Sequence, residues 1–170
     1  METEKETEKT KETEDIIIND TKIKYENGEI YSFIKLGNCH TKKWFLLKGS
    51  FQNTGYCSVK INKKTYLYHR VVYKLHNPDW DITDYSKTNI IDHIDRNKLN
   101  NHISNLRVVT QLQNSYNTNA KGYFYDTNRD SFRTQIAYEC GKVKFLGRFK
   151  TEEEAHKAYL AAKKIYHIII

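Results

Sequence analysis

The chain contains few residues of the kinds that cross-link small proteins or carry them across membranes. It has three cysteines, Cys39, Cys57 and Cys140, which lie far apart and form no Cys-x-x-Cys pair. This argues against a structural zinc site and for an intracellular, reducing compartment, in which the cysteines are packing residues. No apolar run approaches the roughly 20 residues that a spanning helix needs. The amino terminus also lacks a basic region followed by an apolar core, so we expect neither a membrane partner nor a signal peptide.

Positive charge is plentiful by contrast. The formal net charge is +7 over 170 residues, and residues 1–15 contribute −4 to it, so the remainder carries +11. That surplus suits a polyanionic partner such as nucleic acid. The sequence METEKETEKTKETED at residues 1–15 has a single apolar side chain, and we expect it to be a disordered charged tail.

The most informative stretch runs over residues 88–117. It opens with an apolar run that ends in Asp92 and His93, crosses a polar segment as far as Asn105, and returns as Leu-Arg-Val-Val. A helix-start signal follows, because a Thr with a Gln three residues later has the form of a capping box. The pattern predicts strand, long loop, strand and short helix, with Asn114 on the helix.

Side chains of these types suit the hydrolysis of a phosphodiester. A carboxylate and a carboxamide oxygen, here from Asp92 and Asn114, are hard ligands for Mg²⁺ or Mn²⁺. A neutral imidazole beside such an ion, here that of His93, can take a proton from water near neutral pH. Each residue by itself is more often an ordinary loop hydrogen-bonding group. Their combination in order and spacing is what favours a nuclease.

At these positions the chain resembles the HNH nuclease family, in particular the phage and viral homing endonucleases whose third motif residue is Asn. The resemblance implies a ββα-metal motif in which Asp92 and Asn114 bind one divalent metal ion, chiefly Mg²⁺. It further implies that His93 is the general base and that Asn105 holds the loop and the imidazole. Arg96 departs from the family, which usually has Gly in this turn. Because Arg tolerates a positive φ poorly, Arg96 predicts a distorted turn or an added phosphate contact.

The region before the motif, residues 16–65, has the pattern of a β-rich module. Short apolar stretches alternate with turn signals at Asn27-Gly28, near Asn53–Gly55 and at Lys63-Lys64. The segment YHRVVYKLHNPDW that follows resembles the lead-in of the HNH family, where a His-Arg pair opens a short helix. We expect a core or interface role for His69 and a DNA contact for Arg70.

The region after the motif predicts three strands and a helix. The strands read GYFYD, SFRTQIAYE and KVKFLGRF, and Thr151 with Glu154 predicts a capping box at the start of the helix. On the second strand, Arg133 and Gln135 alternate with apolar neighbours and are expected on the free face of the sheet. The predicted apolar face of the helix comprises Ala155, Ala158, Tyr159, Ala162, Ile165 and Tyr166.

Residues 121–167 are similar to the plant ethylene-response-factor (Apetala-type) DNA-binding domain. The match lies in Lys-Gly-Tyr, Phe-Arg-Thr-Gln-Ile, Phe-Leu-Gly-Arg-Phe and the Thr-Glu-Glu-Glu-Ala helix start. The resemblance implies a sheet that enters the major groove, with Leu146 and Phe149 in the core. Phe124 and Asp126 stand where that family commonly has Arg. By resemblance, six residues are expected to face DNA: Lys121, Phe124, Arg133, Gln135, Phe145 and Arg148.

Together these patterns predict an α+β protein with four parts. These are a disordered tail at 1–15, a β-rich module at 16–65, an HNH nuclease core at 66–117 and an Apetala-type domain at 118–170. The predicted function is a metal-dependent DNA endonuclease of the homing type that acts on double-stranded DNA. The sequence leaves the oligomeric state open, with a monomer favoured. Arg96, Arg107 and Arg70 join the six residues above as candidate DNA contacts. Two alternatives stay open, a DNA-binding regulator with a nuclease relic and an RNA-binding protein.

Overall fold

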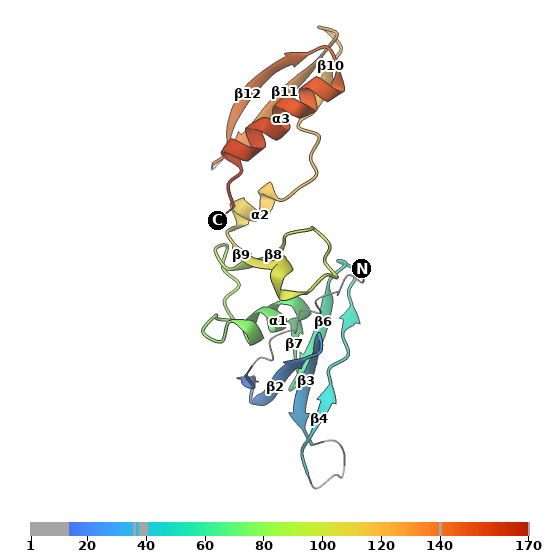
Figure 1. Cartoon of the computed structure of the whole chain (residues 1–170), viewed down its shortest axis with the longest axis vertical. Coiled ribbons are helices and arrows are strands. Elements are labelled where there is room, and N and C mark those ends of the chain that lie inside the picture. The colour runs from blue at the N-terminus through green and yellow to red at the C-terminus, as the bar shows by residue number, and fades with distance from the viewer. Residues whose placement is uncertain (1–13, 36, 38–40, 140, 170) are drawn as a thin grey trace, which may run out of the picture. The chain divides into compact units, whose positions relative to one another are not determined.

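A computed structural model describes residues 14–35, 37, 41–139 and 141–169. These residues form a mixed arrangement of small sheets and three α-helices (Figure 1). Contacts divide the chain into one unit of Met1–Tyr85 with His93–Arg107 and a second of Ser86–Asp92 with Val108–Ile170. Most of the predicted charged tail, together with Cys39 and Cys140, lies outside the described residues. In the described part, every helix is too short or too polar to span a membrane.

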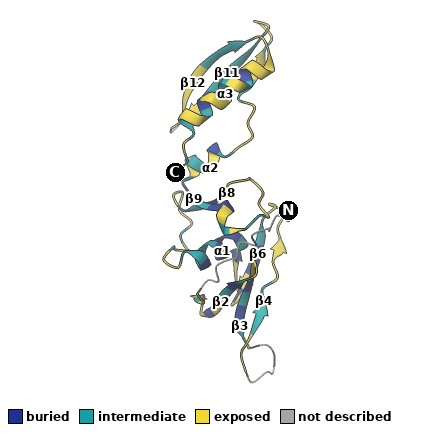
Figure 2. Ribbon diagram, in the orientation of Figure 1, coloured by how far each residue is buried: buried dark blue, intermediate teal, exposed yellow. Residues whose placement is uncertain are grey.

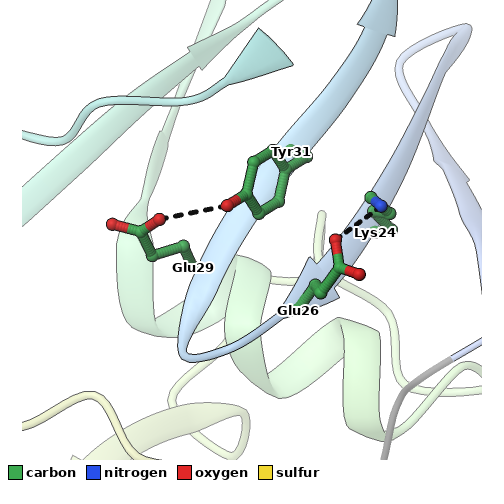
Figure 3. A network of polar contacts seen from close by, with 4 residues as sticks. All are labelled: Lys24, Glu26, Glu29 and Tyr31. Carbon is green, nitrogen blue, oxygen red and sulfur yellow. Dashed lines mark hydrogen bonds and ion pairs between the residues drawn. The ribbon is translucent and has the colours of Figure 1, made fainter. Parts of the chain in front are cut away.

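The first unit begins with a four-stranded antiparallel sheet in the order β1-β2-β3-β4. The predicted hairpin at Asn27-Gly28 is confirmed, with φ values of +52° and +82° as a type I′ turn requires. Side-chain contacts flank this turn, including one of 2.6 Å between Lys24 and Glu26 (Figure 3). The strands are β1 (Ile16–Ile18), β2 (Thr21–Glu26), β3 (Glu29–Ile34) and β4 (Lys43–Leu46).

A second, three-stranded antiparallel sheet leads into the first helix. It comprises β5 (Ser50–Phe51), β6 (Cys57–Ile61) and β7 (Lys64–Leu67), and α1 (Tyr68–His76) follows at once. The predicted turn near Asn53–Gly55 is confirmed, because the Gly55 N–H donates to Gln52 O at 2.9 Å. The next turn uses Asn62 and Lys63, one residue earlier than predicted, and both have a positive φ.

The core of this unit lies where α1 meets these strands, as the buried residues of Figure 2 show. Ile23 and Ile30 from β2 and β3 are fully buried, and so are Val71 and Val72 from α1. The predicted lead-in helix is therefore confirmed, and its His69 is buried as expected.

The predicted order of strand, loop, strand and helix is also confirmed. β8 (Ile90–His93) pairs with β9 (Leu106–Val109), a single 3₁₀ turn (Ile103–Asn105) precedes β9, and α2 (Gln111–Tyr116) follows. The boundary between the units passes through both strands, so each unit includes part of this pair. Both bonds of the capping box are present, with Thr110 Oγ1 accepting from the Gln113 N–H at 3.2 Å and Gln113 Oε1 accepting from the Thr110 N–H at 2.9 Å.

The second unit ends in a three-stranded antiparallel sheet with a helix packed against it. The order is β10 (Tyr123–Asp126), β11 (Ser131–Tyr138), β12 (Lys142–Phe149), and the helix is α3 (Glu152–Tyr166). Thr134 and Ile136 of β11 are buried at 0% and 1% exposure, as the alternation predicted. Their neighbours Arg133 and Gln135 are half-buried.

The first turn of α3 shows one half of its predicted capping box. Thr151 Oγ1 accepts from the Glu154 N–H at 3.2 Å. Further along, Ala155, Tyr159 and Ala162 are buried as predicted. The prediction for Ile165 was wrong, because it is 65% exposed. The last turn meets the sheet through Tyr166, whose ring centre lies 4.8 Å from that of Tyr138 in β11, so helical spacing alone overestimated the width of the buried face.

Candidate functional site

The imidazole of His93 is held within the first unit by three neighbours. His93 ends β8 and is 4% exposed. Its Nε2 lies 3.0 Å from Asn101 Oδ1. The ring of His69 meets it edge-on with centroids 5.0 Å apart, and the ring of Tyr56 lies 6.0 Å away. Because contacts on several sides restrict its rotation, the ring has a fixed orientation.

His69 is a neutral neighbour of that ring at physiological pH. Burial, together with the charges of His93 and Arg70, lowers the pKa of His69 to about 3. A neutral imidazole adds no positive charge next to His93. The contact is therefore one of packing and orientation.

Asn105 holds the loop that joins the two strands of the motif. Its Nδ2 donates to Asp95 Oδ1 at 2.9 Å and to Asn100 O at 2.8 Å, and its Oδ1 accepts from the Asp95 N–H at 3.0 Å. The side chain of Asn100 also donates to Asp95, and this bond is the first of several causes that lower the pKa of Asp95. The contacts thus match the loop-holding role expected for Asn105. The contact to the imidazole comes instead from Asn101, which the motif did not single out.

Arg96 adopts the conformation in which the family usually has glycine. Its φ is +66°, and its N–H donates to His93 O at 2.9 Å to close the turn. The turn forms, and it does so with a non-glycine residue in the left-handed region, which costs about 1 to 2 kcal/mol. The side chain of Arg96 is exposed.

Asp92 belongs to the second unit and is 7% exposed. The Nδ2 of Asn117 donates to both of its carboxylate oxygens, at 3.0 Å each. The predicted ligand Asn114 lies on the exposed side of α2. The signal for Asn117 was present in the sequence as Asn-Ser-Tyr-Asn, which places the second amide about one helical turn after the first.

The oxygen donors near Asp92 fit a hard divalent cation. Among the described residues there is no group of three or more His, Cys, Asp or Glu side chains that could hold a metal ion. The available donors are one carboxylate and the neighbouring carboxamides. This donor type suits Mg²⁺, which keeps several waters and takes the rest of its coordination shell from phosphate. The amide of Asn117 can also turn its oxygen toward a cation, because its two ends are nearly equivalent in shape.

The environment of Arg70 differs from the one expected for a DNA contact. It is 4% exposed, its Nη2 donates to Ile82 O at 2.9 Å and to Asp84 O at 2.7 Å, and it stacks on Trp80 at 4.6 Å. Those contacts use the guanidinium to fix the chain that follows α1. The sequence of the helix alone does not reveal that later residues of the chain bury Arg70.

The free face of the sheet in the second unit gathers cationic and aromatic side chains. Arg133 lies between Phe124 and Phe145, 5.5 and 5.7 Å from their ring centres. Arg148 pairs with Asp126 at 3.1 Å. A cavity of about 510 Å³ is lined by Arg129, Arg133, Phe145 and Arg148.

Arg129 was not among the predicted contacts, although it lies between the first two predicted strands, GYFYD and SFRTQIAYE. Of the remaining candidates, Lys121 is exposed, while Gln135 and Arg107 are half-buried. Leu146 packs against the buried cluster of Ile136, Tyr159 and Ala162, as expected of a core residue.

Known proteins are similar to this chain over its central region. The HNH endonuclease family matches residues 66–116, which begin in β7 and end with α2. The SPbeta prophage-derived protein YosQ of Bacillus subtilis (strain 168), whose name assigns it provisionally to the HNH homing endonucleases, is 38% identical over 74 residues. That match covers 44% of this chain and 40% of YosQ.

Two proteins of Acanthamoeba polyphaga mimivirus, both named uncharacterized HNH endonucleases, are each 36% identical. The matches cover 54% and 45% of this chain, and 26% and 42% of those proteins. The chain therefore matches less than half the length of each relative. No solved structure matches it. From the family match and these relatives we conclude that residues 66–116 carry an HNH endonuclease domain.

Proposed function

We propose that the protein is a metal-dependent endonuclease of the homing type that hydrolyses phosphodiester bonds in double-stranded DNA. One observation carries most of the weight. Within the family match, His93 is buried and fixed by Asn101 and His69, and it directly follows the carboxylate of Asp92 in β8. Base and metal ligand are thus consecutive residues, an order that suits hydrolysis assisted by a single ion.

His93 acts in this proposal as the general base toward water. The imidazole proton is on Nε2 in this proposal, which the 3.0 Å contact to Asn101 Oδ1 supports because an amide oxygen can only accept. Nδ1 then keeps its lone pair and takes the proton from the attacking water. Asn101 is therefore a positioning residue that selects the reactive tautomer, while Asn105 keeps the loop in place.

Asp92 and Asn114 hold the divalent ion in this proposal, with Mg²⁺ or Mn²⁺ as the fitting cations. When bound, the ion stabilises negative charge on the phosphate and on the leaving oxygen. The burial of Asp92 and its contact with Asn117 support this role, because they fix the carboxylate before any cation arrives.

The second unit supplies a DNA-reading surface in this proposal. Arg133 and Arg148 are held by Phe124, Phe145 and Asp126 and line one cavity. Guanidinium groups with restricted rotation suit bidentate contacts to guanine or phosphate. Joining such a surface to a nuclease domain raises the effective concentration of the nuclease at chosen sites.

Supercoiled plasmid tests the activity directly. We expect nicking in Mg²⁺ that stops with EDTA and in the His93→Ala variant, while His156→Ala, which changes a histidine of α3, nicks as the wild type does. Binding of DNA without cleavage in Mg²⁺ or Mn²⁺, unchanged in His93→Ala, would overturn the enzyme and favour the DNA-binding regulator.

A further inference from the structure

The first unit contains a cavity of about 450 Å³ whose lining is mostly aromatic and aliphatic. This volume lies in the range of about 300 to 1,000 Å³ that is typical of small-molecule sites. Its rings and apolar groups stand beside one amide and one imidazole. These lining residues are Tyr25, Phe51, Tyr68, Leu99, Asn101 and His102.

At Gly49, in one wall of this cavity, the backbone packs closely against Cys57. A Cβ at that position would lie 2.1 Å from the Sγ of Cys57, which is far inside van der Waals contact. On the solvent side, Phe51 is 76% exposed and Leu99 is 54% exposed. Single exposed apolar residues are common, but here two of them border the same cavity. The cavity thus offers apolar contact area that is already formed and uncovered.

Asn101 connects the cavity to the proposed catalytic base. The same amide lines the cavity and lies 3.0 Å from Nε2 of His93. His102, the next residue, is oriented by a 2.7 Å contact between its Nδ1 and Ser104 Oγ. A group that fills the cavity would therefore contact the amide that orients the imidazole of His93.

The charge of the lining indicates which part of a DNA strand would enter. None of the described lining residues is Lys, Arg, Asp or Glu, so the cavity offers no strong partner for a phosphate. The cavity of the second unit differs, because three of its four lining residues are arginines. Aromatic rings with one amide and one imidazole suit a nucleobase, which has an apolar face for stacking and a polar edge for hydrogen bonds.

We infer that this cavity receives an unstacked nucleobase of the bound DNA, next to the phosphate that is cleaved. The inference rests on the proposed function, and it adds a substrate contact. Phe51, on the rim, is the stacking partner or wedge. Proteins that unstack DNA insert such apolar side chains between base steps. Asn101 then links the seated base to His93.

Fluorescence of 2-aminopurine tests the inference. The nick site is mapped first, and duplexes with 2-aminopurine at successive positions around it are bound to the full-length His93→Ala variant, which does not cleave. We expect fluorescence to rise several-fold at one or two positions. Adding Phe51→Ala should remove the rise and weaken binding about fivefold or more, the size of one lost stacking contact. Phe51→Trp should restore both. Ile17→Ala, which removes an apolar side chain of similar exposure (74%), should change neither.

The outcomes separate the two proposals. If the protein nicks plasmid and binds the duplexes but fluorescence stays flat at every position, or rises equally with Phe51→Ala, the base site is overturned and the nuclease stands. If the wild type nicks no DNA, the nuclease is overturned, and duplexes of random sequence replace those built around a nick site. Binding with a fluorescence rise that depends on Phe51 then upholds base binding in the cavity but overturns its place beside a cleaved phosphate. Failure to bind DNA overturns both.

Discussion

A single amide nitrogen of Asn117 donates to both carboxylate oxygens of Asp92, at 3.0 Å each. Removing it by Asn117→Ala leaves a buried carboxylate short of its donor, which should lower the free energy of unfolding by about 1 to 3 kcal/mol. Urea denaturation measures this. Asn114→Ala, on the exposed side of α2, should change stability by less than about 0.5 kcal/mol. Equal effects of the two substitutions would contradict the assignment of Asn117 as the partner of Asp92.

Metal-binding measurements test whether Asn114 or Asn117 is a metal ligand. If Asp92 and Asn114 are the ligands, Asp92→Ala should abolish the binding of Mn²⁺ and Asn114→Ala should weaken it at least tenfold, because loss of even an outer-shell partner costs about 10- to 100-fold. Isothermal titration of the full chain with Mn²⁺ gives the affinities. Undiminished binding in Asn114→Ala, with loss in Asn117→Ala, would transfer the ligand role to Asn117.

Arg96 occupies a turn position with a φ of +66°. Arg96→Gly removes the steric cost of this conformation but frees the unfolded chain, so we expect a net gain of about 1 kcal/mol in unfolding free energy. Arg96→Ala keeps the strain and removes the charge. A loss of DNA affinity in both variants would identify a phosphate contact. If Arg96→Gly is no more stable than the wild type, the turn is unstrained.

His69 should make the stability of the first unit depend on pH. Its pKa is about 3 when folded, against an ordinary value near 6.5, so the unfolded chain binds more protons between these values. Its contribution to stability is therefore full above about pH 6.5 and is lost as the pH falls toward 3, with a slope of at most about 1.4 kcal/mol per pH unit. His69→Gln should flatten this slope in urea denaturation series between roughly pH 4.5 and roughly pH 8. An unchanged slope would contradict the burial of the neutral ring.

Asp126 holds Arg148 on the free sheet face. If that face contacts DNA, Asp126→Asn releases one cation, and the slope of log Kd against log salt should steepen by about 1. Discrimination between the preferred duplex and random duplex should fall, because Arg148 is no longer oriented. Binding titrations at several salt concentrations measure both effects. A slope that does not change would place Arg148 outside the DNA contact.

The sequence predicted the elements whose causes are local. Asn27-Gly28 specifies its turn by backbone conformation, and Thr110 with Gln113 specifies a helix start by side-chain bonds over three residues. Predictions were wrong where contacts with a distant segment of the chain determine whether a side chain is buried. Arg70 is buried by chain that lies more than ten residues away, and Ile165 is exposed although its neighbour Tyr166 packs against the sheet. Neither fact has a local signature.

The candidate site divides in the same manner. The candidates Asp92, His93, Asn105 and Asn114 could be identified from the sequence, because the motif is defined by residue order and spacing. The contact of Asn101 with His93 could not be predicted. It depends on how the loop folds back, and that in turn depends on hydrogen bonds from side chains to the backbone.

The loop between β8 and β9 keeps its shape largely through short polar side chains. Asp95 Oδ1 accepts from the Asn97 N–H at 2.8 Å, and Asn97 Oδ1 accepts from the Leu99 N–H at 3.1 Å. These amide protons should exchange with solvent more slowly than those of an open loop, although no helix or strand contains them. The loop loses its conformational freedom when the protein folds, so a ligand that binds there need not order it again.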